Sequence, residues 1–332
     1  MTIETYQQAL PHGITLSCRA SGAPGQPVMI FLHGFPEAAF VWDPLLEHFA
    51  QPANGGYRCI APNLRGYEPS SAPEDVKAYR ARHLVQDIEA LIAVAGAQQL
   101  APTLAANAAA LPPEGAQSAW GGPAPIECLV AHDWGGAVAW NLANQLPHLV
   151  NKLAIINSPH PGTFLRELQN NPRQQAASAY MNFLVRPDAE KLLAEKDYAR
   201  MWPFFTNGAA GAGWLTDSVK AQYRQIWNGK AGRPPGSGLV GGCNYYRASP
   251  LRPAEPREPV AAVVDLPRDK LTVKIPTLVL WAMDDVALLP ELIDGLDQYV
   301  PNLTLEKVAG ASHWIVHERP EFVAQRLAHF LQ

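Results

Sequence analysis

Residues 126–143 have the sequence IECLVAHDWGGAVAWNLA. The first third is apolar and predicts a buried strand, and the small and apolar residues at its end predict a helix. Ala131 and Gly135 lie two residues before and two residues after Asp133. Small residues at these flanks are typical of a nucleophile elbow, a tight strand–turn–helix corner that exposes its central side chain. The sequence therefore predicts an exposed, reactive side chain at Asp133.

A carboxylate at the centre of the elbow, in place of the familiar serine, restricts the chemistry. Asp133 is ionised at neutral pH and needs no base to make it nucleophilic. Acyl transfer to a carboxylate would give an unstable anhydride, whereas displacement at a saturated carbon gives an alkyl ester. Opening an epoxide and expelling a halide are both displacements of this kind. The elbow thus predicts attack on saturated carbon and excludes ordinary esterase chemistry.

The composition is that of a compact globular protein. Of the 332 residues, 48% are hydrophobic and 17% are charged, and the net charge is −4. The sequence contains no block of Lys or Arg, so nucleic acid and membrane surfaces are not expected partners. The four cysteines are far apart and lack metal-binding spacing, which predicts buried thiols in a reducing compartment. Without a signal-peptide pattern or an apolar run of about 18 residues, the chain is predicted to be cytoplasmic.

The rest of the chain alternates between strand and helix patterns. Continuous apolar runs over 28–32, 57–61, 152–157 and 276–281 have the character of strands buried on both faces. Amphipathic spacing between such runs, as over 79–94, predicts helices. The alternation favours an α/β fold, with a mostly parallel twisted sheet and helices on both of its faces. In sheets of this kind, ligands bind at the carboxyl ends of the strands.

Several segments depart from this alternation. Over 159–272 the strand pattern is absent, while helical patches and aromatic residues are frequent. We expect this segment to form a helical cap inserted in an α/β core made of 1–158 and 273–332. Within the core, the Ala- and Pro-rich residues 97–125 predict a surface insertion. Within the cap, the Gly- and Pro-rich residues 228–242 predict a flexible loop.

Two further polar side chains lie where a reactive site would form. Asp285 follows a predicted strand, and His313 precedes the last helix. Nucleophile, then acid, then histidine is the chain order of α/β hydrolases. A histidine oriented by a carboxylate can activate water to hydrolyse an ester on Asp133. Asp284 competes with Asp285 as the acid, and His317 competes with His313 as the base.

Hydrolysis of such an ester also requires hydrogen-bond donors for the oxyanion. The backbone N–H groups of Phe35 and Trp134 are placed to provide them, the first after a predicted strand and the second next to the nucleophile. We expect Phe35, Trp134 and Tyr245 to contact the substrate. His33 and His132 are predicted to hold the loops by hydrogen bonds rather than to react.

Six short motifs are spread along the chain: His33-Gly34-Phe35-Pro36-Glu37, Leu64-Arg65-Gly66-Tyr67, His132-Asp133-Trp134-Gly135-Gly136, Asn157-Ser158-Pro159-His160-Pro161, Asn244-Tyr245-Tyr246-Arg247 and Gly310-Ala311-Ser312-His313-Trp314. Together they make the chain resemble the epoxide hydrolases of the α/β hydrolase superfamily, neighbours of the haloalkane dehalogenases. The resemblance covers nearly the whole chain and implies an α/β-hydrolase fold with a helical cap. Its register also favours Asp285 over Asp284 as the acid.

In the family that the chain resembles, the cap supplies two tyrosines that donate protons to the epoxide oxygen. Tyrosine, with a pKa of about 10, stays protonated at neutral pH and can donate. Tyr246, in the motif over 244–247, matches the second of these positions, with Tyr245 as the alternate. Tyr180 matches the first, although residues 185–187 read Val-Arg-Pro where Gln-Glu-Pro is often found.

The resemblance implies an enzyme that converts an epoxide and water to a vicinal diol through an ester on Asp133. Two alternatives stay open: a haloalkane dehalogenase with the same nucleophile, and a non-catalytic ligand-binding protein of the same fold. A halide site would use N–H donors, and the second donor position often follows His-Gly, where this chain has Phe35. No metal or cofactor is expected, because water and side chains suffice. The expected partner is a small hydrophobic epoxide, and a homodimer is one option for the assembly.

Overall fold

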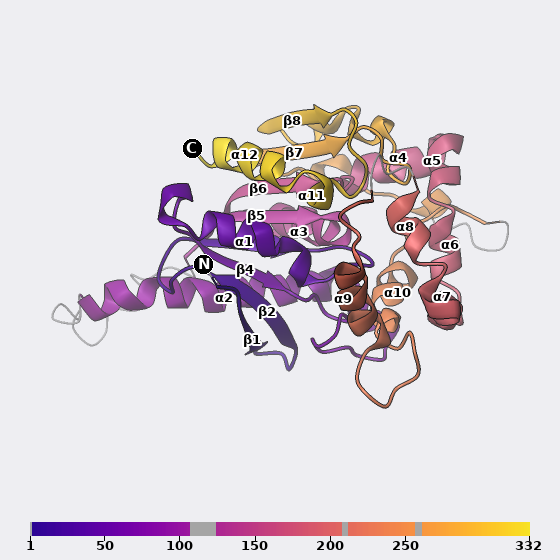
Figure 1. The fold of residues 1–332 in the computed structure, drawn as a ribbon. Helices are drawn as coiled ribbons and strands as arrows, with labels where there is room; N and C mark the ends of the chain where they lie inside the picture. Colours follow the sequence, from indigo (N-terminus) through magenta and orange to yellow (C-terminus); the bar gives the residue numbers. More distant parts are fainter. Residues whose placement is uncertain (1, 107–123, 208–211, 256–260) are drawn as a thin grey trace.

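A computed structural model describes residues 2–106, 124–207, 212–255 and 261–332 (Figure 1). Within these residues, eight strands form one sheet in the order β1-β2-β4-β3-β5-β6-β7-β8. The strands are β1 (Glu4–Ala9), β2 (Thr15–Ser21), β3 (Val28–Leu32), β4 (Arg58–Pro62), β5 (Ile126–His132), β6 (Val150–Ile156), β7 (Thr277–Ala282) and β8 (Leu303–Val308). Pairing is antiparallel between β1 and β2 and between β2 and β4, and all other pairs are parallel. The predicted α/β fold with a mostly parallel sheet is confirmed.

The middle of the sheet is buried on both faces. Every residue of β3, β4 and β7 is buried, as the continuous apolar runs predict. β5 lies near the centre, between β3 and β6, and its Val130 pairs with Phe31 of β3. The carboxyl ends of the parallel strands meet at one edge of the sheet, and β5 ends there at His132.

Helices cover both faces of the sheet. They are α1 (Asp43–Phe49), α2 (Ala81–Ala106), α3 (Asp133–Gln145), α11 (Ile315–Glu318) and α12 (Pro320–Leu331). α1 contacts α12, whereas α2 contacts α3. α3 also packs on β5 and β6, which fixes the helix that begins at Asp133 against the sheet. No helix in the described part of the chain combines the length and the apolar character that a membrane crossing requires.

Between β6 and β7 the described chain contains a series of helices and no strand. These helices are α4 (Pro161–Asn170), α5 (Pro172–Ala177), α6 (Tyr180–Leu184), α7 (Ala189–Tyr198), α8 (Trp202–Thr206), α9 (Asp217–Asn228) and α10 (Leu239–Ala248). Figure 1 shows them beside the carboxyl ends of the strands. The middle of the chain is thereby brought next to the elbow.

The insertion predicted over 97–125 starts later than expected. α2 continues to Ala106, well past the predicted helix end at residue 94. Alanine is the best helix former and is frequent in this part of the sequence, which favours continuation of the helix. The remainder of the predicted insertion, over 107–123, lies outside the described residues.

The loop predicted over 228–242 also differs from the structure, because α10 begins at Leu239. The glycines that suggest a loop serve helix packing instead. A Cβ atom on Gly241 would collide with the backbone of Gly66, so glycine allows α10 to approach that turn closely. This close approach fixes the helix that carries Tyr246.

Candidate active site

The elbow has the tight geometry that its sequence predicts. β5 ends at His132 and α3 begins at Asp133, whose backbone is left-handed with φ of 49°. A Cβ atom on Gly135 would collide with the carbonyl oxygens of Leu32 and His33, so the corner requires glycine there. A positive φ at a non-glycine residue is strained, and such strain is concentrated at functional sites. The corner presents Asp133 at the carboxyl edge of the sheet.

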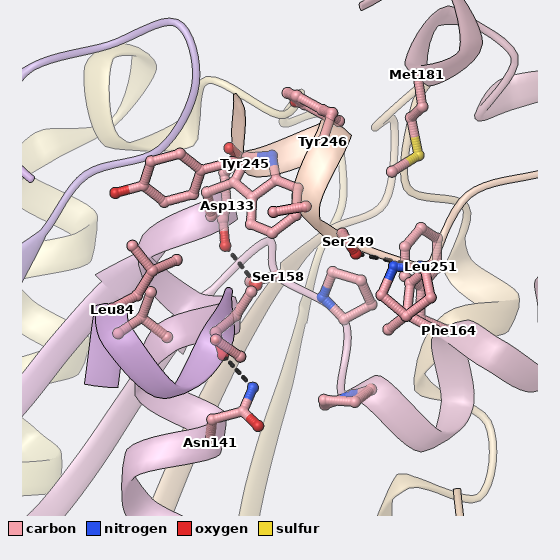
Figure 2. A pocket seen from close by; sticks show the side chains of 18 of the residues that line it. Leu84, Asp133, Asn141, Ser158, Phe164, Met181, Tyr245, Tyr246, Ser249 and Leu251 are labelled. Atoms are coloured by element: carbon pink, nitrogen blue, oxygen red, sulfur yellow. Dashed lines mark hydrogen bonds between the residues drawn. The ribbon is translucent and has the colours of Figure 1, made fainter. Parts of the chain in front are cut away.

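Asp133 is contacted by three separate segments of the chain. The backbone N–H of Phe35 donates to Asp133 Oδ1 at 2.7 Å. His313 Nε2 lies 3.8 Å from the other carboxylate oxygen, Oδ2. The hydroxyl of Ser158 donates to the backbone carbonyl of Asp133 at 2.6 Å (Figure 2). One carboxylate oxygen is thus hydrogen-bonded, while the other faces the histidine.

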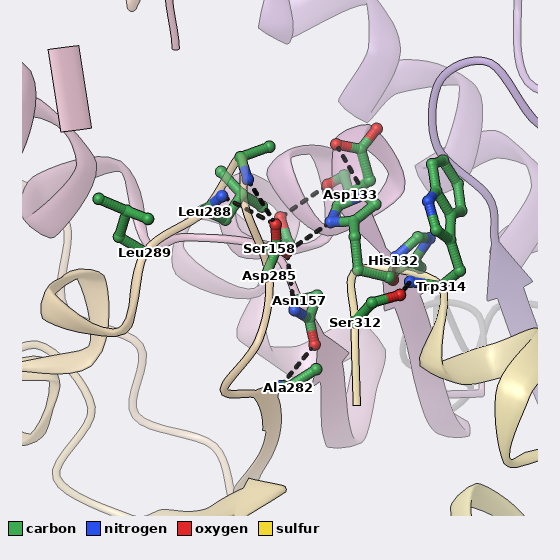
Figure 3. A network of polar contacts seen from close by, with 12 residues as sticks. His132, Asp133, Asn157, Ser158, Ala282, Asp285, Leu288, Leu289, Ser312 and Trp314 are labelled. Carbon is green, nitrogen blue, oxygen red and sulfur yellow. Dashed lines mark hydrogen bonds and ion pairs between the residues drawn. The ribbon is translucent and has the colours of Figure 1, made fainter. Parts of the chain in front are cut away.

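His313 and Asp285 form a buried pair. His313 Nδ1 lies 2.6 Å from Asp285 Oδ2, which also accepts the side-chain N–H of Asn157 at 2.8 Å. Asp285 Oδ1 accepts the backbone N–H groups of Ala287 and Leu288, both at 2.9 Å (Figure 3). Because both of its oxygens are bound, Asp285 is held in one orientation and in turn orients the imidazole.

The alternatives to Asp285 and His313, which are Asp284 and His317, lie outside this pair. Asp284 is exposed, whereas Asp285 is buried beside His313. His317 lies on α11, where its Nε2 is 2.6 Å from Glu37 Oε1. The structure therefore brings together Asp133, Asp285 and His313, and it leaves the other two candidates out of this group.

Burial and charge act in opposite directions on the pKa values of the pair. Burial alone would raise the pKa of Asp285, but the charge and hydrogen bond of His313 lower it below the usual value. Burial alone would lower the pKa of His313, but the carboxylates of Asp285, Asp133 and Glu37 raise it to about 9. At neutral pH, His313 therefore keeps its proton as long as these carboxylates are charged.

Two tyrosines from the helical segment lie over the elbow. Tyr180 is the first residue of α6, and Tyr246 lies on α10. Their ring centroids are 6.2 Å apart, and the ring of Tyr246 also meets those of Phe35 at 5.4 Å and Trp134 at 5.0 Å. Burial raises the pKa of both phenols, and the charge of Asp133 adds to the effect. Both hydroxyls are therefore protonated at neutral pH.

Two cavities border the elbow. One has a volume of about 220 Å³ and the other of about 310 Å³, and Asp133, Tyr180 and Tyr246 line both of them. The smaller cavity continues along an apolar wall that includes Leu84, Val138, Phe164, Met181, Leu251 and Leu266 (Figure 2). His313 and Asp285 line the larger cavity. Asp133 and the two phenols thus lie between an apolar compartment and the histidine.

The family is decided by a match over most of the chain. A family model described as the alpha/beta hydrolase family matches residues 29–326. The chain belongs to the α/β hydrolase family. The match runs from β3 to α12 and includes the elbow and the helical segment. Together with the eight-stranded sheet, it confirms the fold predicted from the sequence.

Relatives of this hydrolase match it along its whole length. YfhM, an AB hydrolase superfamily protein of Bacillus subtilis, is 31% identical over 322 residues, which cover 97% of this chain and 96% of YfhM. A solved structure of novel epoxide hydrolases from metagenomes of hot environments is 33% identical, with a TM-score of 0.77 and coverage of 100% of this chain and 99% of that one. A variant of the Bacillus megaterium epoxide hydrolase, solved with its product (R)-3-[1]naphthyloxy-propane-1,2-diol, is 26% identical, with a TM-score of 0.75 and coverage of 98% and 99%. The protein is an α/β hydrolase similar to epoxide hydrolases.

The other predicted contacts of the hydrolase line the same cavities. Phe35 lines the larger cavity, and Trp134 and Tyr245 line the smaller one. The hydroxyl of Tyr245 donates to the carbonyl of Arg65 at 2.9 Å, so the alternate to Tyr246 already has a partner. The backbone N–H of Trp134 lies in the first turn of α3, where N–H groups have no partner within the helix.

Two histidines hold loops of the hydrolase, as predicted. His33 Nε2 accepts the backbone N–H of Leu64 at 3.1 Å, which ties the loop after β3 to the loop after β4. His132 Nε2 lies 2.9 Å from the carbonyl oxygen of His313. The residue before Asp133 therefore supports the loop that carries His313.

Sequence reasoning missed Asn157, which supports Asp285. Its backbone is left-handed, with φ of 39°. Its side-chain oxygen accepts the backbone N–H of Ala282 at 2.9 Å, while its side-chain N–H binds Asp285 (Figure 3). The available signal was its position, because a polar residue directly after a buried strand lies at the ligand-binding edge of the sheet.

Sequence reasoning also missed the role of Glu37. Its side chain is buried, with 1% exposed. Its carboxylate binds His132 at 3.0 Å, His317 at 2.6 Å and the hydroxyl of Tyr223 at 3.3 Å. Burial alone would raise the pKa of Glu37, but the hydrogen bonds of the two histidines lower it. The carboxylate therefore stays charged and connects four segments of the hydrolase.

The described residues contain no cluster of three or more His, Cys, Asp or Glu side chains that could hold a metal ion. All four cysteines are buried and free, as the sequence predicts. Burial raises the pKa of each thiol, which keeps it protonated and weakly reactive at neutral pH.

Proposed function

We propose that the hydrolase converts a hydrophobic epoxide and water to a vicinal diol through an ester on Asp133. Asp133 Oδ2 attacks an epoxide carbon, the C–O bond breaks, and Tyr180 or Tyr246 gives its proton to the departing oxygen. Once the ester has formed, the proton that His313 carried passes to the tyrosinate. The neutral imidazole then takes a proton from water, and the hydroxide attacks the carbonyl carbon of the ester. Collapse of the tetrahedral intermediate releases the diol and restores the carboxylate. The proton taken from water restores the protonated His313.

The position of the two tyrosines carries this proposal. Asp133, Tyr180 and Tyr246 line both cavities, so a ring opened at the carboxylate has two protonated phenols beside it. An epoxide oxygen leaves as an alkoxide that stays attached to the substrate and needs a proton donor. A leaving halide needs no proton, and Phe35, at the second position of a halide site, has an apolar side chain. The arrangement favours an epoxide over a haloalkane.

The contacts of Asp133 also suit hydrolysis of the ester. Phe35 N–H donates to Oδ1, which becomes the carbonyl oxygen of the ester when Oδ2 attacks and then carries the negative charge of the intermediate. One such donor is worth roughly 2.7–4 kcal/mol. Ester formation also removes the charge of Asp133, one of the three carboxylates that raise the pKa of His313. The histidine thus loses its proton more readily at the stage that needs a base.

The apolar wall supports a hydrophobic substrate. We propose that the epoxide substituent occupies the smaller cavity and that the attacking water lies in the larger one, next to His313. The product bound to the Bacillus megaterium relative carries a naphthyloxy group, which is consistent with an aryl substituent here.

We further propose that residues 159–272 form a cap on a core made of 1–158 and 273–332. The segment between β6 and β7 supplies both phenols, whereas the core supplies the nucleophile, the acid and the base. Ring opening then requires both parts of the chain, and ester hydrolysis uses the reactive side chains of the core.

A single-turnover reaction in ¹⁸O-water, with the enzyme in excess over an aryl epoxide, tests the ester mechanism. The diol takes its new oxygen from the carboxylate, so ¹⁸O should appear in the peptide that contains Asp133 and not in the diol. Label in the diol with an unlabelled peptide would contradict an ester on Asp133. The Asp133→Ala variant should form no diol.

A substrate panel separates the proposed function from its alternatives. Diol formation from epoxides, without halide release from bromoalkanes, is the expected result. Halide release without diol formation would indicate a haloalkane dehalogenase. Tight binding of small molecules without turnover of either class would indicate a ligand-binding protein.

A further inference from the structure

The N–H group of Phe35 belongs to a tight turn over residues 34–37, which we call the donor turn. The backbone N–H of Glu37 donates to the carbonyl of Gly34 at 3.0 Å and closes the turn. Gly34 lies so close to Asp133 that a Cβ atom would collide with the carboxylate side chain. A small movement of the donor turn would therefore change the hydrogen bond between Phe35 N–H and Asp133 Oδ1.

Helix α9 of the helical segment holds this turn at two points. The indole N–H of Trp227 donates to the carbonyl of Pro36 at 2.8 Å, and the Trp227 side chain is fully buried. One helical turn earlier, the hydroxyl of Tyr223 lies 3.3 Å from Glu37 Oε1 and 3.2 Å from His317 Nε2. Residues four apart share one face of a helix, so both contacts come from the same side of α9.

Aromatic packing fixes the position of that face. The rings of Tyr223 and Trp227 are stacked, with centroids 5.3 Å apart and an interplanar angle of 19°. The ring of Phe205 lies 4.8 Å from Tyr223 and 6.1 Å from Trp227. The two polar atoms that reach the donor turn therefore have little freedom to move.

We propose that Trp227 and Tyr223 are positioning residues for the oxyanion donor. They hold the donor turn so that Phe35 N–H points at Asp133 Oδ1. Neither of the two lines the cavities beside the elbow, so they act through the turn and not on the substrate. This inference rests on the proposed function, because the donor matters to a reaction that places negative charge on Oδ1.

The two half-reactions respond differently to a displaced donor. In the first, Oδ2 attacks and the carboxylate loses charge, so Phe35 N–H gives little selective stabilisation to the transition state. In the second, Oδ1 carries the charge of the tetrahedral intermediate and depends on the donor. A loosened turn should therefore slow ester hydrolysis and spare ester formation. Slower hydrolysis lowers kcat and KM together and leaves kcat/KM unchanged.

The Trp227→Phe variant removes the indole N–H and keeps an aromatic ring. We expect kcat and KM for an aryl epoxide to fall by about tenfold each, less than the hundredfold or more that loss of a whole oxyanion donor costs. The matched control is Trp202→Phe. The ring of Trp202 lies 4.9 Å from that of Trp227, but its N–H donates to the carbonyl of Asp197 and not to the donor turn. The control should keep the kcat and KM of the wild type.

A second readout needs no substrate. Hydrogen exchange at the amides of Phe35 and Glu37 should be faster in Trp227→Phe than in the wild type and in the Trp202→Phe control. Should Trp227→Phe not fold, Tyr223→Phe removes one hydroxyl from the same turn and is expected to act in the same direction.

Unchanged exchange, or a fall in kcat with an equal fall in kcat/KM, would overturn the positioning role, because general loss of active protein lowers both rates. Failure of the proposed function would look different. The wild type would then form no diol from any epoxide, while the exchange measurement would still report whether α9 holds the turn.

Discussion

The two carboxylates of the site differ in how they are bound. Asp285 has both oxygens engaged, by His313 and Asn157 on one side and by backbone N–H groups on the other. Asp133 has Oδ1 bound to the Phe35 N–H and Oδ2 turned toward the histidine across 3.8 Å. A fully bound carboxylate orients its neighbour, and a carboxylate with one oxygen toward the cavity is suited to attack.

We expect the Asp285→Asn variant to form the ester but to hydrolyse it very slowly. The amide lacks the charge that orients His313 and raises its pKa, and the loss in kcat should be on the order of 10³–10⁴-fold. Intact-protein mass spectrometry after addition of an aryl epoxide should show the alkylated enzyme accumulating. The adjacent Asp284 is exposed, and Asp284→Asn should turn over like the wild type. Equal losses in the two variants would contradict the role given to Asp285.

The role of the two phenol hydroxyls in ring opening can be tested separately. Tyr180→Phe and Tyr246→Phe each remove a proton donor and keep the ring, so kcat/KM for an epoxide should fall by roughly 10²-fold. Rapid-quench measurement of ester formation reports this step directly. Tyr299→Phe is the control, because Tyr299 lines neither cavity. Ester formation at the wild-type rate in both tyrosine variants would remove the argument for an epoxide.

Among the secondary-structure elements, those with strong apolar periodicity were predictable and those without it were not. The strand and helix of the elbow follow from an apolar run and a glycine corner. β1, with the sequence ETYQQA, is largely exposed at the edge of the sheet and has few apolar residues to reveal it. α10 contains adjacent glycines at 241 and 242, which local rules assign to loops. Their use in close helix packing depends on Gly66, which is distant in the sequence.

The same reasoning explains which parts of the site were predictable. Asp133, Asp285 and His313 follow strands or precede a helix, and local patterns locate such positions. The contact between Tyr223 and Glu37 joins residues 186 positions apart, and no local pattern reports it. Pairing across such a distance depends on how the helices pack on the core.

The corner between β5 and α3 should not tolerate a methyl group. In Gly135→Ala the added Cβ would collide with backbone oxygens of Leu32 and His33, which cannot move aside as a flexible side chain can. We expect a loss of about 1–3 kcal/mol in the free energy of unfolding, together with loss of diol formation. Gly213→Ala is the control, because nothing lies within 4 Å of the added atom. Urea unfolding of both variants gives the comparison, and equal stability would contradict the steric argument.

Across the whole molecule, the ends of the helical segment are joined by one histidine. His160 lies directly before α4, where its Nδ1 accepts the backbone N–H of Gly162 at 3.2 Å. Its Nε2–H donates at 3.0 Å to the carbonyl of Leu271, close to the start of β7. β6 and β7 are neighbours in the sheet, so the segment leaves the core and returns to it at nearly the same place. The ring must be neutral to make both hydrogen bonds.

This histidine should make the hydrolase less stable in acid. Burial lowers the pKa of His160 to about 4 from an unfolded value near 6.5, so the unfolded chain binds the proton more readily. Stability is therefore lost as the pH falls from about 6.5 to about 4, by about 2 kcal/mol between pH 7 and pH 5 for this group. Urea unfolding at the two pH values should show a smaller difference for His160→Asn. His329→Asn, at an exposed position on α12, should keep the wild-type difference in unfolding free energy between the two pH values. The same difference in both variants would contradict the role given to His160.

The hydrogen bonds between α9 and the donor turn matter for protein engineering. Because β6 and β7 are neighbours in the sheet, the helical segment between them could be replaced by one from another hydrolase. The replacement would change the cavity walls and therefore the epoxides that fit. Such a chimera would inherit Asp133, Asp285 and His313 from the recipient. Unless the graft also carried counterparts of Tyr223 and Trp227, we expect the ester to form at its usual rate and to be hydrolysed more slowly. A graft without them would accumulate the ester during turnover, whereas one with them would keep the donor turn in place.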